Sequence, residues 1–152
     1  MRTRVSAYSS RMQRDIDWLD VCRRIREEMT GEHAVGRVIA RPFTGVPGAF
    51  ARTAGRRDFS VEPPGETVLD ALCDAGVPIH GVGKVRDLFA GRGISEHHPA
   101  PGNPEALAAT GALLRDLDAG MVFTNLIDTD QLFGHRKDVE GFHAALQEID
   151  LA

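Results

Sequence analysis

Residues 120–127 read Gly120-Met-Val-Phe-Thr-Asn-Leu-Ile127, a nearly continuous apolar run of the length of one strand. Such a run is typical of a strand that is buried on both faces, as in a parallel sheet. Helical patterns flank it at residues 104–117 and 138–149. This alternation of strand and helix predicts an α/β fold with an open sheet that is at least partly parallel.

The same alternation begins at residue 67. Residues 67–75 and 84–89 have the apolar spacing of short helices, and residues 77–82 that of a short strand, whereas the Gly-, Pro- and His-rich residues 91–101 are predicted to be a loop. Only about two strands are expected here, against about five or six in a typical sheet. The sheet is therefore predicted to be incomplete in this chain or to be completed by a partner.

The tripeptide Pro63-Pro64-Gly65 marks a change of pattern, and we expect a boundary there between domains 1–62 and 63–152. Four stretches of the first domain carry a prediction: an amphipathic helix at 13–29, a short strand at 35–40, a loop at 42–47, and loop with some extended backbone at 50–62.

Composition places the chain among ordinary globular proteins. Of its 152 residues, 42% are hydrophobic and 26% are charged, and the formal net charge is only -4, so no global field favours nucleic acid or a membrane surface. The sequence also lacks an apolar stretch of about 18 residues and an N-terminal secretory signal, so neither a membrane span nor secretion is predicted. Cys22 and Cys73 lie among apolar helical positions and are predicted to be buried free thiols.

Three possible metal ligands follow the apolar run: Asp128, Asp130 and His135. Ligands of open α/β sheets gather at the carboxyl ends of strands, and a carboxylate with an imidazole suits Mn²⁺ or Zn²⁺. A turn at Gly134 would bring Asp130 and His135 to one ion. Spacing alone leaves a second interpretation open, in which an aspartate caps a helix and the histidine lies on the surface.

Five arginines and no acid lie between residues 37 and 57, which predicts a site for a discrete anion. Guanidinium groups bind phosphate oxygens in pairs and stay charged at any working pH. Lys84 follows Gly81-Val-Gly83 at a strand-to-helix turn that would also suit an anion. The alternatives are a solvated basic loop and a surface lysine. His97 and His98 are predicted to be surface residues, and His80 shows no partner pattern.

Five segments, in order along the chain, resemble phosphopentomutase of the alkaline phosphatase superfamily. They are Val35-Gly-Arg-Val-Ile-Ala-Arg-Pro-Phe43, Phe50-Ala-Arg-Thr-Ala-Gly-Arg-Arg-Asp-Phe-Ser60, Thr67-Val-Leu-Asp-Ala-Leu72, Gly81-Val-Gly-Lys-Val-Arg-Asp-Leu-Phe-Ala-Gly91 and Phe123-Thr-Asn-Leu-Ile-Asp-Thr-Asp-Gln-Leu-Phe-Gly-His-Arg-Lys-Asp138. The first and fourth argue against another mutase of the superfamily, the metal-dependent phosphoglycerate mutase. The resemblance covers the chain from about residue 15 onward.

The resemblance implies part of an alkaline-phosphatase-like α/β core, residues 63–152, with a portion of an α/β cap domain, residues 1–62. The family interconverts ribose 1-phosphate and ribose 5-phosphate, and their deoxy forms, with two manganese ions (Mn2+) and a phosphorylated threonine. The resemblance implies that Asp130 and His135 bind one metal ion. It also implies sugar-phosphate contacts for four further residues, namely Arg37, Ile39, Arg52 and Lys84.

Other parts of the family pattern have no counterpart here, among them the nucleophilic threonine and the remaining metal ligands. We therefore expect a truncated, inactive piece of a phosphopentomutase, with the missing core segments or self-association through exposed strand edges as its interactions besides pentose phosphate. The alternative is a non-catalytic sugar-phosphate-binding or interaction module.

Overall fold

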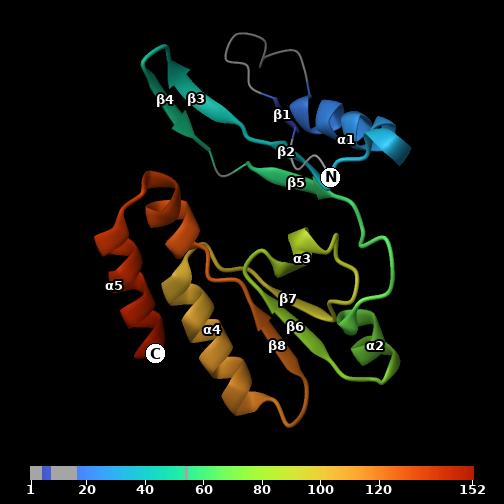
Figure 1. Ribbon diagram of the computed structural model, residues 1–152, viewed down its shortest axis with the longest axis vertical. Helices are drawn as coiled ribbons and strands as arrows, with labels where there is room; N and C mark the ends of the chain where they lie inside the picture. Colours follow the sequence, from blue (N-terminus) through green and yellow to red (C-terminus); the bar gives the residue numbers. More distant parts are fainter. Residues whose placement is uncertain (1–4, 8–16, 54) are drawn as a thin grey trace. The chain divides into compact units, whose positions relative to one another are not determined.

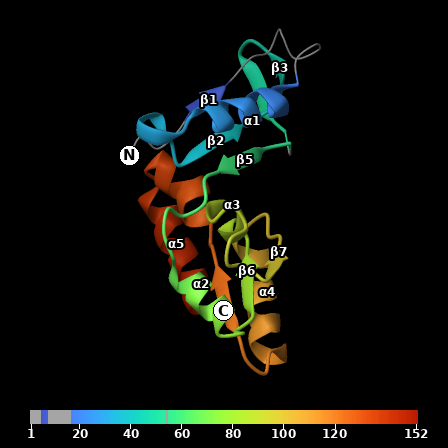
Figure 2. The same ribbon diagram turned by 90° about the vertical axis from the view of Figure 1, so that its right-hand side faces the viewer.

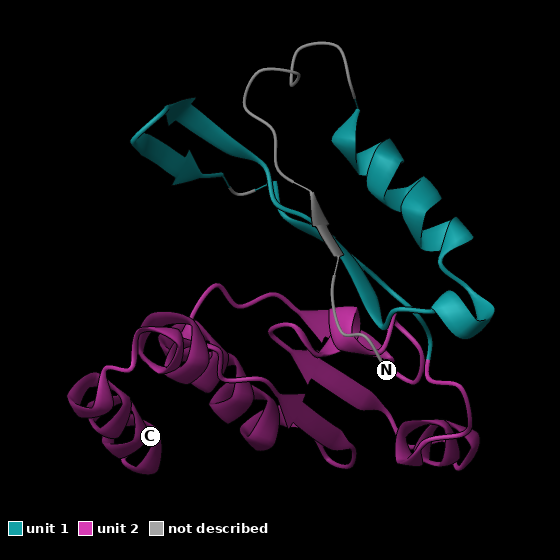
Figure 3. Cartoon of the chain, turned by 45° about the horizontal axis from the view of Figure 1, so that its top comes forward, with its two compact units in different colours: residues 1–62 teal, residues 63–152 magenta. Residues whose placement is uncertain are grey.

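The computed structural model describes residues 5–7, 17–53 and 55–152 (Figure 1). The α/β fold predicted from the sequence is confirmed. The chain divides between Glu62 and Pro63 into two compact units, residues 1–62 and 63–152 (Figure 3), and each is described by itself. Among the described residues no helix is both long enough and apolar enough to cross a bilayer.

Unit 1 is a helix packed on a small sheet (Figures 1 and 2). Helix α1, Trp18–Glu28, begins where the Asp17 carboxylate accepts hydrogen bonds from two backbone N–H groups of the first turn. Residues 13–16 of the predicted helix lie outside the described residues. The helix packs on the sheet through a single apolar cluster: Cys22, Ile25, Met29, Val35, Val38, Ala40 and Phe59.

The sheet of unit 1 has the order β1-β2-β5. Strand β1, Val5–Ala7, runs parallel to β2, Arg37–Ala40, and β5, Arg57–Ser60, runs antiparallel to it. The register pairs Ile39 with Asp58. Because side chains alternate across a strand, Arg37, Ile39 and Asp58 lie on the face opposite the α1 cluster.

A second, two-stranded sheet corrects the loop predicted at residues 42–47. Strands β3, Phe43–Val46, and β4, Ala49–Arg52, form an antiparallel hairpin in which Val46 pairs with Ala49. The two residues between them are Pro47 and Gly48, and Gly48 has a φ of 89°. Proline followed by glycine at positive φ is a favoured turn. Of the residues predicted to be a loop, 43–46 therefore form a strand, and Pro47 begins the turn of the hairpin.

Unit 2 contains a three-stranded sheet of order β7-β6-β8 in which both pairs are parallel (Figure 1). The central strand β6, Ile79–Val82, is buried throughout, whereas β8, Met121–Thr124, is only half-buried. The predicted parallel pairing is confirmed. The loop predicted at residues 91–101 was wrong in part, because Glu96–His98 form β7, a third strand.

Helices cover both faces of this sheet. On one face α4, Asn103–Asp116, contacts β8, where the hydroxyls of Thr110 and Thr124 lie 2.6 Å apart. On the other face, the Phe89 ring after α3, Val85–Leu88, meets Phe123 edge-on at 5.9 Å between centroids. Two further helices, α2 (Val68–Asp74) and α5 (Val139–Asp150), precede β6 and follow β8.

The cysteines are both free, as predicted, but only one of them is buried. Cys22 belongs to the α1 cluster, and burial raises the pKa of its thiol. Cys73 is exposed, so its predicted burial was wrong. Cys73 follows Leu69, the buried residue of α2, by one turn on the same side of the helix, but it lies in the last turn and remains exposed.

Helix α2 is held by a capping box and by an arginine from later in the chain. Thr67 and Asp70 bond each other's backbone N–H groups, and Arg92 Nε donates to Asp70 Oδ1 at 2.8 Å. The hydrogen bond from Arg92, followed by those from Thr67, lowers the pKa of Asp70 from 3.8 to about 2.

Acid should weaken unit 2 through Asp70. Because its pKa is lower in the folded state than in the unfolded state, the contribution of the carboxylate is complete above about pH 4 and is lost as the pH falls toward about 2. Asp70→Asn should therefore unfold more easily than the wild type at about pH 6, and the difference should shrink near about pH 2.5. Urea unfolding followed by far-UV circular dichroism measures this. Asp74→Asn, at an exposed position of α2, is the control; an equal gap for Asp70→Asn at every pH would contradict the assignment.

Candidate functional site

Asp130 and His135 lie in two successive helical turns that follow β8. The turn η2, Thr129–Phe133, is π-helical, and η3, Gly134–Arg136, is a 3-10 turn. This winding brings His135 Nε2 to 3.3 Å from Asp130 Oδ2. The side chains are 71% and 76% exposed, so the pair has room to accept further ligands from outside the chain. Two donor atoms bound to one ion stand about 3 Å apart, so this spacing suits a shared metal ion.

Asp128, two residues earlier, has a structural contact instead. Its Oδ2 accepts a hydrogen bond from the backbone N–H of Asn103 at 2.7 Å, and its own N–H donates to Asn103 Oδ1 at 3.0 Å. Asn103 is the first residue of α4 and is buried. A carboxylate at this helix N-terminus is electrostatically favourable. Asp128 thus connects the start of α4 to the segment that follows β8. The sequence had left open that an aspartate of this segment caps a helix, and Asp128 has such a role at the earlier helix α4.

Lys84 approaches the same region from the end of β6. Gly83 before it has a φ of 77°, and a Cβ at Gly83 would lie 2.9 Å from the carbonyl oxygen of Asn125. Only glycine therefore permits this close approach of the two strand ends. Lys84 Nζ donates to Gln131 Oε1 at 3.2 Å. Gln131 follows Asp130 in η2, so the structure brings Lys84 to the turn that carries the predicted metal ligands.

The predicted phosphate-binding arginines of unit 1, Arg37 and Arg52, lie in two different sheets. Arg37, at the start of β2, pairs with Asp58 through Nη1 and Oδ2 at 3.0 Å. Ile39 is completely buried beside it on the same face. Arg52 ends β4 on the separate hairpin and is exposed. Within the residues that the structure describes, Arg52 forms no ion pair.

Asp58 is the residue that the sequence did not single out. It also accepts two hydrogen bonds of 2.7 Å from Arg56, and its side chain is only 3% exposed. One carboxylate therefore neutralises part of the charge of two arginines in the predicted anion site. The sequence feature that could have identified Asp58 is its position directly after Arg56 and Arg57, where a single acid ends a basic stretch.

A second set of possible metal ligands was also missed. His80, Glu96 and His98 form the group of three titratable side chains that could hold a metal ion within the described parts of the chain. His98 was predicted to be a surface residue, but its side chain is 24% exposed and lies 3.0 Å from His80. His97, the other predicted surface histidine, lies 2.9 Å from the carbonyl oxygen of Gly83 through Nε2. The cause of both errors is that β7 had been taken for a loop.

The fold and the site place the chain in a class of α/β proteins whose polar residues gather where parallel strands end. In this chain a carboxylate–imidazole pair and a lysine lie at that edge. No protein-family model matches the chain. Curated relatives are more informative. A phosphopentomutase of Carboxydothermus hydrogenoformans is 52% identical over 130 residues, which cover 86% of this chain and 34% of the relative.

Two further phosphopentomutases match to the same extent. That of Caldanaerobacter subterraneus subsp. tengcongensis is 50% identical over 130 residues, covering 86% of this chain and 33% of the relative. That of Anaeromyxobacter sp. (strain K) is 51% identical over 135 residues, covering 89% and 34%. The predicted resemblance to part of phosphopentomutase is confirmed: most of this chain is phosphopentomutase-like, and it spans about a third of the length of these relatives.

Removing Asp58 should destabilise unit 1. Asp58→Ala leaves Arg37 and Arg56, each less than a third exposed, facing each other without their shared acid. Hydrogen bonds to charged groups contribute about 1.5–3 kcal/mol, so we expect a loss of about 1–3 kcal/mol in the free energy of unfolding. Denaturant unfolding followed by fluorescence of Trp18, the single tryptophan, reports on this unit. Glu32→Ala, an exposed acid of unit 1, is the control; an unchanged midpoint for Asp58→Ala would refute the role.

Proposed function

We propose that this chain supplies sugar-phosphate and metal contacts of a phosphopentomutase-type active centre. The activity that this name denotes moves a phosphate between the C1 and C5 positions of ribose or deoxyribose. The observation that carries the proposal is the identity of about half of the aligned residues to proteins named phosphopentomutase, over 86–89% of the chain. The same kinship supports a cytoplasmic protein with an alkaline-phosphatase-like core in residues 63–152 and a portion of the cap domain in residues 1–62.

In this proposal Asp130 and His135 hold one Mn2+ ion. The chemistry of the donors fits, because manganese accepts both carboxylate and imidazole ligands. The spacing of 3.3 Å and the exposure of both side chains are compatible with an ion that binds further ligands from elsewhere. When bound, the ion would supply a Lewis acid that offsets negative charge on a phosphoryl group.

The cationic side chains bind the sugar phosphate. Lys84 is held toward η2 by Gln131, so its ammonium lies beside the turn that carries the metal ligands. Arg52 offers a permanently charged, exposed guanidinium that forms no ion pair with an acid among the described residues. Arg37 is held by Asp58 and orients one edge of its guanidinium toward that acid, while Ile39 contributes apolar packing beside it. Arg52 is therefore the residue whose loss should weaken phosphate binding most directly.

Ribose 5-phosphate binding tests this assignment. Wild-type chain should bind it in calorimetry with Mn2+ present, and Arg52→Ala should bind about 10- to 100-fold more weakly, since a hydrogen-bonded charge contributes about 1.5–3 kcal/mol. Arg24→Ala removes a 76% exposed arginine of α1 and serves as the matched control. Absence of binding by the wild type, or equal binding by Arg52→Ala, would rule out the phosphate role of unit 1.

A kinetic measurement separates catalysis from binding. The 152 residues contain two of the expected metal ligands and no counterpart of the family's nucleophile, so a polypeptide of these residues should not convert ribose 1-phosphate into ribose 5-phosphate. Conversion above that of a mock purification would show that these residues suffice for catalysis. Binding without conversion would agree with the proposal and also with the alternative of a non-catalytic sugar-phosphate-binding module.

A further inference from the structure

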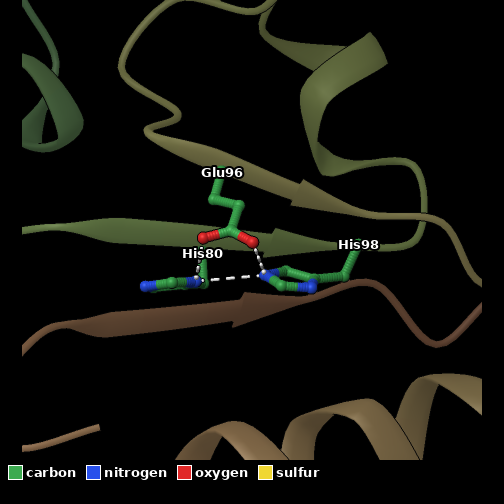
Figure 4. A group of neighbouring side chains, drawn as sticks. All are labelled: His80, Glu96 and His98. Atoms are coloured by element: carbon green, nitrogen blue, oxygen red, sulfur yellow. Dashed lines mark hydrogen bonds and ion pairs between the residues drawn. The ribbon is translucent and has the colours of Figure 1, made fainter.

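Three side chains of unit 2 converge on one face of the parallel sheet (Figure 4). His80 is the second residue of β6, and Glu96 and His98 are the first and last residues of β7. The register pairs His80 with Glu96. Since side chains two positions apart on a strand point to the same face, His98 joins the other two. The parallel pairing of β6 with β7 thus creates the cluster.

The three potential donor atoms are close to one another. His80 Nδ1 lies 3.0 Å from His98 Nε2, 3.6 Å separates His80 Nδ1 from Glu96 Oε2, and 3.7 Å separates His98 Nε2 from Glu96 Oε1. In a tetrahedral site with bonds of about 2.0–2.1 Å, two donor atoms stand about 3.3 Å apart. The measured separations bracket this value. An ion placed among the three atoms would therefore need little movement of the side chains.

The two histidines of the cluster are largely buried, whereas the glutamate is exposed, and this combination suits a bound ion. The side chains of His80 and His98 are 9% and 24% exposed, so the sheet and its surroundings restrict both imidazoles. Glu96 is 61% exposed, which leaves one side of the cluster open to water and to an entering ion. Buried imidazoles that face each other need a proton or a metal ion between their nitrogens, because two lone pairs repel. In the absence of a metal ion, a proton shared in a hydrogen bond between the two rings meets this need.

We propose that His80, Glu96 and His98 form a binding site for a divalent transition metal, such as Zn²⁺, distinct from the Asp130–His135 pair. Two imidazoles and one carboxylate are an established donor set for zinc, with the fourth position left to water or an external ligand. The ion would replace the shared proton between the two rings. This site does not depend on the phosphopentomutase-type activity proposed above.

The location of the cluster suggests what the ion does. Strand β7 lies at one end of the sheet order and β6 lies at its centre. A metal bridge would fasten the edge strand, through two of its three residues, to the most buried strand of unit 2. A ligand that binds only the folded state stabilises it by mass action. Zn²⁺ should therefore raise the unfolding temperature by about 10 °C at a hundredfold excess over its Kd.

Metal titration of the complete chain tests the proposal. Calorimetry with Zn²⁺, and visible absorption of Co²⁺ as a tetrahedral reporter, should show one tightly bound equivalent in the wild type, in addition to any weaker binding by the two donors Asp130 and His135. Glu96→Gln should weaken binding at least about tenfold, and His98→Gln should weaken it more, because each removes one of three protein ligands. Circular dichroism verifies the fold of each variant. Glu96 is exposed, so Glu96→Gln remains decisive even where a histidine variant unfolds.

Matched controls separate this site from other histidines and acids. His143→Gln and Glu66→Gln change exposed residues and should leave affinity unchanged. The double variant Asp130→Asn/His135→Gln should also retain the tight equivalent and the tetrahedral Co²⁺ spectrum. Loss of that equivalent in the double variant together with its retention in Glu96→Gln would overturn the proposal, as would absence of stoichiometric binding by the wild type.

Discussion

The parallel alignment of β6 with its two neighbours is the constraint on which the polar features of unit 2 depend. Because parallel strands end at the same edge, Lys84 after β6 and the turns after β8 are brought to one region. Gly83 makes the approach possible, since any larger residue would meet the Asn125 carbonyl. The same alignment, on the other side of β6, sets His80 opposite Glu96. One backbone arrangement thus accounts for both candidate metal-binding groups.

In unit 1 a single buried carboxylate has a comparable role. Asp58 holds Arg37 and Arg56 and fixes their orientation on the face of the sheet that α1 does not cover. Pairing with Asp58 lowers the net charge of these arginines. The group therefore attracts anions less strongly than five unpaired arginines would. Arg52, exposed on the β3–β4 hairpin, retains its full charge. The two kinds of arginine therefore suit different parts of the proposed function: Arg37 would orient the site, and Arg52 would capture the ligand.

Much of the fold was readable because it rests on local signals. The helices α2, α4 and α5 follow apolar spacing and start at residues that the helix rules favour, as Thr67 and Asp138 illustrate. Strands β3 and β7 were missed for a common reason. Each is only three or four residues long and contains glycine or polar side chains, so its stability comes from pairing with a partner strand rather than from its own composition.

The sequence by itself determined the α/β alternation, the change of pattern beside Pro63, and the identity of the residues that resemble phosphopentomutase, because these depend on neighbouring residues and on motif order. Only the tertiary structure decided which of those residues meet. It joined Lys84 to Gln131, paired Arg37 with Asp58, and placed His98 beside His80. Such contacts arise from strand register and chain crossing, which bring together side chains that no local pattern relates.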